Sequence, residues 1–261
     1  MKISEIIHLL EQLAPLEFQE DYDNSGLITG DSALECTGVL ISLDCNEEVV
    51  REAMERQCNL VVSHHPLIFR PIRNITTGDE IGNTLITAIR AGITIYAIHT
   101  NLDNILTGVN ATLADKLNLI NRKILFPRKD PQEVGSGLLG DLKPAIPENR
   151  LLELLKQVFR LRVIRHSPLL GRPISRVAIC GGSGSFLISN ALQAEAGFFI
   201  SADIKYHDFF QAQGKIVIAD IGHFESEQFT VDLLHSVILG KFPNFAVLKS
   251  GKVTNPVNYY L

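Results

Sequence analysis

Short apolar runs alternate with stretches of helical periodicity along the chain, and this alternation restricts the possible folds more than any other feature. The first half carries apolar runs of strand length at 38–43, 59–63 and 93–98. The stretches between and after them predict helices over 47–56, 81–91 and 108–117, the first of them capped by Asn46. Alternating strands and helices predict an α/β fold whose sheet is mostly parallel and covered on both faces.

The same alternation resumes in the second half of the chain. Strands are expected over 176–180, 198–201, 215–220 and 246–249, and helices over 148–159, 186–195 and 228–239. The intervening segment 126–137 mixes proline, glycine and charged residues, which is typical of a connector. We therefore predict two α/β halves, 1–125 and 138–261, joined by 126–137, with a discontinuous boundary as an alternative. No residue-by-residue repeat relates the halves.

The N-terminal segment is expected to be a helix rather than a targeting signal or a membrane span. Ile6, Ile7, Leu10 and Leu13 fall at helical spacing behind Ser4, which we expect to cap the helix. The four cysteines form no C-x-x-C pair, and reduced thiols in a cytoplasmic protein are the simplest interpretation. The formal net charge is -5, and the absence of a Lys/Arg cluster argues against nucleic acid as a partner.

Imidazoles and carboxylates follow several of the predicted strands. One apolar run is followed directly by His64 and His65, the next is followed shortly by Asp103, and a third by His223 and Glu227. Ligands of open α/β sheets bind beyond the carboxyl ends of the strands. Each motif also has an ordinary structural interpretation, such as a turn residue for Asp103 or a shared helix face for His223 and Glu227. Their recurrence at strand ends favours a metal site.

Three imidazoles and two carboxylates are a suitable ligand set for two divalent ions. Glu227 is the expected bridging carboxylate, which would hold the ions about 3.5–4 Å apart. The mixed nitrogen and oxygen donors suit Zn, Fe, Mn, Co or Ni without choosing among them. Structural zinc sites usually contain cysteine, and no cysteine adjoins these residues, so we expect coordination positions open to water or to a small-molecule substrate.

Three further features have two interpretations each. His207 follows another strand and is either a proton donor near the metals or a residue without a chemical role. His99 either orients a metal ligand or binds nothing. A glycine-rich run either cradles a phosphate with its backbone amides or is a tight turn that needs glycine. This run consists of Gly181, Gly182, Ser183 and Gly184.

The ordered set of motifs resembles a family of dinuclear-metal proteins called Ngg-interacting-factor-three-like, known as GTP cyclohydrolase I type 2 homologues. The matching stretches are 23–27, 63–66, 99–103, 181–184 and 222–227, together with 202–207. The resemblance implies that the metal ligands are His64, His65, Asp103, His223 and Glu227. It also implies two related α/β domains with the metals in a cleft between them, a ring-shaped homohexamer, and GTP ring opening with release of formate.

This sequence departs from some relatives at one place. Those relatives carry an extra domain between the two halves, for which 126–137 leaves no room. Three functions are consistent with the motifs. They are a metal-dependent hydrolase of a nucleotide such as GTP, a phosphoesterase, and a non-catalytic metal-binding or interaction protein that forms a ring.

Overall fold

The computed structural model describes residues 1–260, which form two compact units. The first unit comprises Met1–Leu102 and Thr230–Val257, and the second comprises Asp103–Phe229 with the residues from Asn258 onward. These boundaries differ from the predicted division at 126–137, because the last strand of the chain pairs with a strand of the first unit.

The sheet of the first unit is parallel apart from one edge strand. Its strand order is β1-β4-β3-β2-β11, and only β1 runs antiparallel to its neighbour. The strands are β1 (Gly26–Thr29), β2 (Val39–Ser42), β3 (Leu60–Ser63), β4 (Thr94–Ala97) and β11 (Val247–Lys249). Residues of β2, β3 and β4 are buried throughout, as expected of parallel strands covered on both faces.

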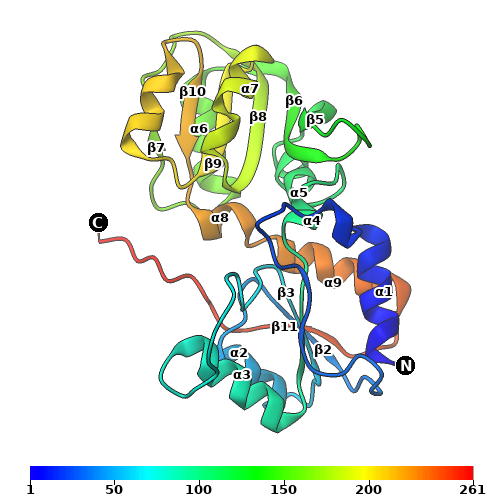
Figure 1. Cartoon of the computed structure of the whole chain (residues 1–261). Coiled ribbons are helices and arrows are strands. Elements are labelled where there is room, and N and C mark those ends of the chain that lie inside the picture. Colours follow the sequence, from blue (N-terminus) through cyan, green and yellow to red (C-terminus); the bar gives the residue numbers. More distant parts are fainter. Residues whose placement is uncertain (261) are drawn as a thin grey trace. The chain divides into compact units, whose positions relative to one another are not determined.

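Helices cover both faces of this sheet, as Figure 1 shows with α2 and α3 on one side and α1 and α9 on the other. Leu40, Val61 and Ile95 of the strands pack against Val49 of α2 and Ala88 of α3 in one apolar cluster. The helices are α1 (Ile3–Leu13), α2 (Glu47–Glu55), α3 (Glu80–Ala91), the short α4 (Thr100–Asp103) that ends in the second unit, and α9 (Thr230–Lys241).

The predicted caps of two helices have different outcomes. The Asn46 side chain accepts a hydrogen bond from the Val49 amide, which confirms it as the N-cap of α2. The prediction of Ser4 as the cap of α1 is wrong, because Lys2 takes that position. The Glu5 carboxylate accepts a hydrogen bond from the Lys2 amide at 2.7 Å, so the helix start is satisfied without a hydroxyl side chain.

The sheet of the second unit is mixed and has the order β5-β6-β8-β9-β10-β7. Its centre, β8-β9-β10, is parallel, and the outer strands are antiparallel to their neighbours. The strands are β5 (Ile120–Pro127), β6 (Gly135–Ile146), β7 (Arg165–His166), β8 (Ile174–Ser183), β9 (Phe198–Ala202) and β10 (Val217–Asp220). The segment 126–137, predicted as a connector, instead lies at the turn of the β5–β6 hairpin.

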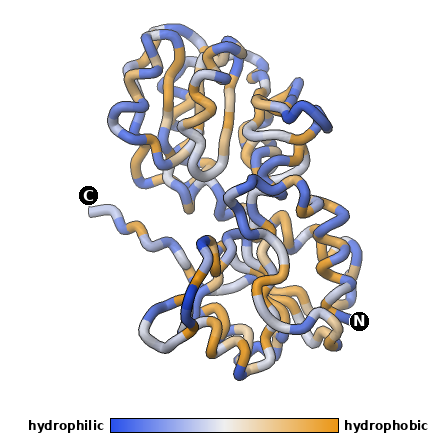
Figure 2. Tube along the Cα trace, viewed as in Figure 1, coloured by the Kyte–Doolittle hydropathy of each residue, from blue (hydrophilic) through white to orange (hydrophobic). Residues whose placement is uncertain are grey.

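Successive side chains of the central strands point to opposite faces of the sheet and contribute to two apolar clusters. Phe198 and Ile200 pack toward Leu113 and Phe159, whereas Phe199 packs on the opposite face with Ala191. The helices are α5 (Val109–Lys116), α6 (Glu148–Val158), η2 (Ser185–Leu187), α7 (Ile188–Gln193), η3 (Tyr206–Ala212) and α8 (His223–Glu227). Figure 2 shows apolar colour along these central strands and polar colour along the outer loops. Throughout residues 1–260, every helix is too short or too polar to cross a bilayer.

The polar residues of interest follow the parallel strands of each sheet. In the first unit, Ser42, Ser63 and Ala97 pair in register as the last residues of β2, β3 and β4. In the second unit, Ser201 and Asp220 pair in register near the ends of β9 and β10. The carboxyl ends of neighbouring parallel strands meet at one edge, which brings the residues that follow them together. The predicted α/β fold with mostly parallel and mixed sheets is confirmed.

Candidate metal centre

Three imidazoles gather at the strand ends of the first unit. His64 and His65 directly follow β3, and a single residue, Ile98, separates His99 from the end of β4. Their ring centroids are 4.9 Å apart for His64 and His65, 5.2 Å for His64 and His99, and 5.3 Å for His65 and His99. One nitrogen from each ring lies within 4.8 Å of the other two, so these residues could hold a metal ion.

The Nδ1 atom of each ring donates a hydrogen bond to an oxygen that can only accept. The acceptors are the Ile98 carbonyl at 2.8 Å for His64, Asp44 Oδ1 at 2.7 Å for His65 and Asp23 Oδ1 at 2.8 Å for His99. A neutral imidazole whose Nδ1 carries the proton offers Nε2 as its lone-pair donor. Carboxylate or carbonyl partners of this kind orient the histidine ligands of metal sites. Nε2 is therefore the atom through which each of the three rings could bind a metal.

Two carboxylates behind these rings are themselves held in place. The Thr254 hydroxyl donates a hydrogen bond to Asp44 Oδ2. The Asp23 side chain is fully buried and accepts hydrogen bonds from the Asn24 amide and from the amide and hydroxyl of Thr100. Burial alone would raise the pKa of Asp23, but the hydrogen bonds from His99 and Thr100 hold this pKa well below its usual range.

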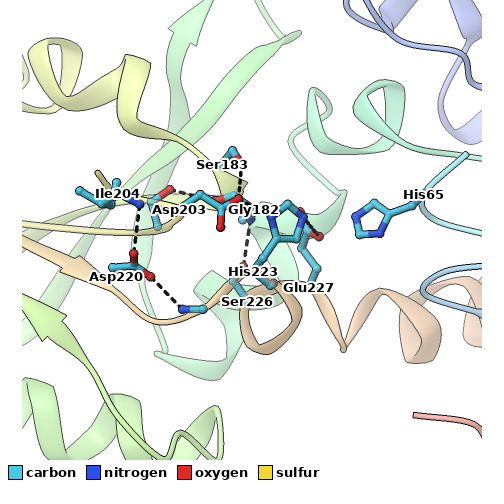
Figure 3. A network of polar contacts seen from close by, with 12 residues as sticks. His65, Gly182, Ser183, Asp203, Ile204, Asp220, His223, Ser226 and Glu227 are labelled. Atoms are coloured by element: carbon cyan, nitrogen blue, oxygen red, sulfur yellow. Dashed lines mark hydrogen bonds and ion pairs between the residues drawn. The ribbon is translucent and has the colours of Figure 1, made fainter. Parts of the chain in front are cut away.

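In the second unit, His223 and Glu227 lie one helical turn apart. His223 begins α8 two residues after β10, beyond Ile221 and Gly222, and its Nε2 lies 3.0 Å from Glu227 Oε2. Its Nδ1 bonds Asp203 Oδ2 at 2.7 Å, and Asp203 also accepts a hydrogen bond from the Ser183 hydroxyl (Figure 3). Asp203 follows β9, so the ends of neighbouring strands supply both partners. The predicted pairing of His223 with Glu227 on one helix face is therefore present.

The carboxylates on either side of His223 govern its protonation. Burial alone would lower the pKa of this imidazole, but the bonds and charges of Asp203 and Glu227 raise it to about 11. The bond from His223 is also the largest cause that lowers the pKa of Asp203. The ring therefore carries a proton on Nε2 as well as on Nδ1. Metal binding releases such protons, so a divalent cation could replace the one that faces Glu227.

Asp103 lies beside Glu227 in the second unit. One carboxylate oxygen of each residue lies within 4.8 Å of the other. Burial and the charges of Asp103 and Glu227 raise the pKa of the Cys180 thiol, which keeps this cysteine protonated. Asp103, Glu227 and His223 thus form a neighbouring set of oxygen and nitrogen donors, with Glu227 common to both pairs.

The glycine-rich run lies against these donors instead of forming an open loop. The Gly181 amide donates a hydrogen bond to Asn110 Oδ1, and the Gly182 amide donates to Ser226 Oγ, both at 2.9 Å. Gly182 has a φ of +61°, and a Cβ at this position would lie 2.3 Å from Glu227 Oε1. Close packing and a positive φ explain why glycine is needed there. The two amides are engaged within the protein, and phosphate binding by this run stays a prediction.

His207 lies in η3 and is exposed. Its ring is 5.2 Å from that of Tyr206 and 6.2 Å from that of Phe210. The structure therefore places His207 in an exposed aromatic group, and its suggested role as a proton donor stays a prediction. His99, by contrast, lies in the three-imidazole group, although the sequence suggested at most an orienting role for it.

The donors of each unit suit divalent transition metals. The first unit offers three imidazole nitrogens, and in the second unit Glu227 lies beside the imidazole of His223 and beside the carboxylate of Asp103. The sequence interpretation did not single out Asp44 or Asp203, which orient His65 and His223. Each of these aspartates follows a predicted apolar run, so the rule that located the histidines would also have found them.

Comparisons with known proteins find similarity to one protein family over almost the whole chain. A family model described as Duf34/NIF3 (NGG1p interacting factor 3) matches residues 1–256. A Clostridium perfringens protein named GTP cyclohydrolase 1 type 2 homolog is 34% identical over 229 residues, with 87% of each chain covered. A Campylobacter jejuni protein of the same name is 33% identical, with 100% of both covered. The crystal structure of a Staphylococcus aureus hypothetical protein, 28% identical, superposes with a TM-score of 0.91 over 100% of this chain and 99% of that one.

Proposed function

Because the chain belongs to the Duf34/NIF3 family, we propose that it is a dinuclear metal-dependent hydrolase acting on a nucleotide or a phosphorylated small molecule. The observation that carries the proposal is the fixed orientation of the candidate ligands. At four histidines, Nδ1 bonds an oxygen acceptor, so each of these rings would bind a metal through Nε2, and at His223 the metal would replace the proton that faces Glu227. A purely structural histidine does not require this arrangement, and its repetition in both units favours metal binding.

The proposed ligands come from both units of the chain. Oxygen and nitrogen donors of this kind bind Zn, Fe, Mn, Co or Ni, and Glu227 is suited to bridging because it lies beside both Asp103 and His223. The two proposed ions take as their ligands His64, His65, Asp103, His223 and Glu227.

Bound divalent ions would supply Lewis acidity, which polarises an electrophile and acidifies water near neutral pH. The chain's own residues orient this chemistry. Asp44 and Asp203 hold the rings of His65 and His223 and increase the basicity of their Nε2 atoms. Because the Glu227 side chain is buried and therefore poorly screened by water, its carboxylate attracts a cation more strongly than an exposed one would. These residues therefore favour the binding of a divalent cation at the proposed site.

GTP is the proposed substrate, supported by the name of the curated relatives. Opening of the purine imidazole ring consumes one water molecule, and release of formate consumes a second. His207 is the proposed proton donor and the glycine-rich run from Gly181 to Gly184 the proposed triphosphate contact. A ring-shaped homohexamer, which the family resemblance implies, and a cytoplasmic location, which the bacterial relatives support, belong to the same proposal.

The engaged amides of Gly181 and Gly182 favour a second candidate function. Since both already donate hydrogen bonds within the protein, a triphosphate would have to displace those partners before the glycine-rich run could hold it. The same donors could then serve a non-catalytic protein that holds metal, with binding adding stability by mass action. A phosphoesterase, which needs water activation but no purine contact, is the remaining alternative.

Product identification distinguishes these functions. The metal-reconstituted protein is incubated with GTP, with ATP and with a panel of phosphoesters, and formate, ring-opened purine and free phosphate are measured. The proposal predicts formate from GTP, lost in Glu227→Gln and retained in Glu225→Gln, which changes a neighbouring carboxylate of the same helix. Free phosphate without formate identifies a phosphoesterase. Saturating metal without any product refutes the hydrolase.

A further inference from the structure

An exposed aromatic pair lies beside the three-imidazole group of the first unit. Tyr22 precedes β1, Phe69 lies in the segment between β3 and α3, and their ring centroids are 6.2 Å apart. The Phe69 ring also lies 6.1 Å from that of His99. Tyr22 is 62% exposed and Phe69 is 42% exposed, so both rings keep much of their surface accessible. Neighbouring exposed aromatic side chains at a candidate site are typical of a binding surface.

The main chain next to both rings is held in place. The Asn24 side-chain amide donates a hydrogen bond to the Ile68 carbonyl at 2.7 Å, which links the two segments that carry the aromatic residues. The Glu20 amide donates a hydrogen bond to Thr100 Oγ1 at 2.9 Å. The chain is therefore fixed on both sides of Tyr22 and directly before the second ring, which reduces the conformational entropy lost when a ligand binds.

Arg70 and Arg73 add positive charge next to this pair. Both side chains are exposed, and among residues 1–260 neither forms a hydrogen bond or an ion pair. Residues 67–78 contain these two arginines and no acidic residue, in a chain whose formal net charge is -5. The acidic residues Glu20 and Asp21 belong to the other segment, so the positive charge is confined to one side of the pair. Because guanidinium groups bind phosphate through paired hydrogen bonds, a phosphorylated ligand complements that side.

We propose that Tyr22 and Phe69 stack against the base of a purine nucleotide and that Arg70 and Arg73 attract its phosphate groups. This inference rests on the proposed function and identifies the residues of the first unit that recognise the substrate. Every nucleobase has a flat face that stacks on aromatic side chains, and nearby cationic groups attract the phosphates of the same ligand. Attraction by exposed charges extends over several ångströms, so it is compatible with the phosphate contact proposed for the glycine-rich run.

The proposed chemistry explains why the base should lie at this place. In GTP ring opening the attacked atom belongs to the purine, so the base has to lie beside the metal ligands. The Phe69 ring contacts the ring of His99, whose centroid is 5.2 Å from that of His64 and 5.3 Å from that of His65. A phosphoesterase requires phosphate at that place and gives an aromatic pair no role. The pair therefore favours a substrate that reacts at its base.

Binding of 2-aminopurine riboside triphosphate to the Zn(II)-reconstituted full-length chain, measured on rapid mixing, tests this inference. The chain contains no tryptophan, so the probe is excited selectively, and stacking on an aromatic ring quenches its fluorescence. We expect quenching in the wild type. Phe69→Leu, which keeps apolar bulk without the ring, should weaken binding about 5–100-fold and relieve the quenching. Tyr22→Ala should act in the same way, whereas Tyr22→Phe should change neither. Phe126→Ala, at a phenylalanine that is 52% exposed in the second unit, is the matched control.

Inorganic triphosphate separates the contribution of the arginines from that of the rings. As a competitor of the probe, it should bind the double variant Arg70→Gln/Arg73→Gln about 5-fold more weakly than the wild type. It should bind Phe69→Leu as tightly as the wild type, because it has no base to stack. Arg90→Gln, at an exposed arginine of α3, is the control for the change in charge.

Unchanged affinity and quenching in Phe69→Leu and Tyr22→Ala, or a wild-type chain that leaves the probe unquenched, would overturn the inference. Equal affinities for inorganic triphosphate in the double arginine variant and the wild type would overturn the part assigned to the arginines. Self-association that Phe69→Leu abolishes, without any binding of the probe, would overturn the inference and identify the pair as a contact between copies of the chain.

The proposed function fails by a different result. Quenching of the probe without formate release from GTP refutes the hydrolase and leaves the stacking site in place. Formate release with an unchanged KM for GTP in Phe69→Leu and Tyr22→Ala refutes the stacking site and leaves the hydrolase in place.

Discussion

Replacing Gly182 with alanine tests how closely the backbone of β8 approaches the Glu227 carboxylate. A Cβ at this position would lie 2.3 Å from Glu227 Oε1 and 3.3 Å from His223 Cε1. Oε1 must retreat by about 0.7 Å to reach 3.0 Å, whereas metal–ligand distances vary by only about 0.2 Å. Because the Glu227 side chain is 3% exposed, it has little space in which to move and still point at the same ion.

Two costs are expected in Gly182→Ala, and a second glycine separates them. The φ of +61° disfavours any side chain by about 1–2 kcal/mol, and overpacking against Glu227 adds about 1–3 kcal/mol. Gly171 has a φ of +72° with nothing within 4 Å of the added Cβ, so Gly171→Ala carries only the first cost. We therefore expect Gly182→Ala to be the less stable of the two and to bind metal about 10–100-fold more weakly than wild type.

Urea denaturation of the metal-free proteins measures the stability difference, and titration with Zn(II) against a competing chelator measures the affinity. Gly171→Ala should bind Zn(II) like the wild type. Equal free energies of unfolding and equal Zn(II) affinities in the two variants would refute the argument that Gly182 is required by its contact with Glu227.

Three further predictions concern charge, orientation and the core. Burial alone would raise the pKa of Glu52, but hydrogen bonds from Ser250, the Gly251 amide and Arg56 lower this pKa below its ordinary value of 4.5. The ionised carboxylate therefore contributes to the free energy of unfolding above pH 4.5, and this contribution is lost as the pH falls through the lowered pKa. Glu52→Gln should therefore cost about 1.5–3 kcal/mol at pH 7 and progressively less below pH 4.5 in denaturant titrations, and a pH-independent cost would contradict this. Asp203→Asn should weaken Zn(II) binding about 10–100-fold by releasing His223, whereas Asp232→Asn, at an exposed ion pair, should leave it unchanged, and equal affinities would refute the orienting role. Phe198→Ala should lower the free energy of unfolding by about 3–5 kcal/mol in calorimetry, since its ring is fully buried between helices and sheet, and a loss below 1 kcal/mol would be inconsistent with that packing.

The parallel strands could be predicted from sequence because burial on both faces leaves a continuous apolar run. β2, β3, β4 and β10 all lie within runs identified in this way. The β5–β6 hairpin could not be predicted, because β5 is an edge strand and edge strands tolerate the residues that usually interrupt strands. Lys123 is exposed on β5, Pro127 ends that strand, and Gly135 begins β6, so the sequence pattern of the segment is that of a polar connector.

Ligand candidates were more predictable than the residues that orient them. His64, His65 and His223 stand directly beyond the apolar runs, and the strand-end rule identifies them without any knowledge of pairing. The roles of Asp23 and Asp203 depend on contacts with residues distant in sequence. Asp23 lies 76 positions from His99, and Asp203 lies 20 positions from His223. Composition assigns Asp23 to a turn, and only the tertiary structure shows which ring its carboxylate holds.

Anomalous diffraction from crystals of the Zn(II)-reconstituted protein tests the central claim, that the chain binds two ions through the identified donors. At the zinc absorption edge we expect two peaks per chain, with Nε2 of His64, His65 and His223 and a carboxylate oxygen of Glu227 at about 2.0–2.2 Å from zinc. Zinc bound through Nδ1, peaks away from these residues, or no peak after reconstitution would contradict the claim.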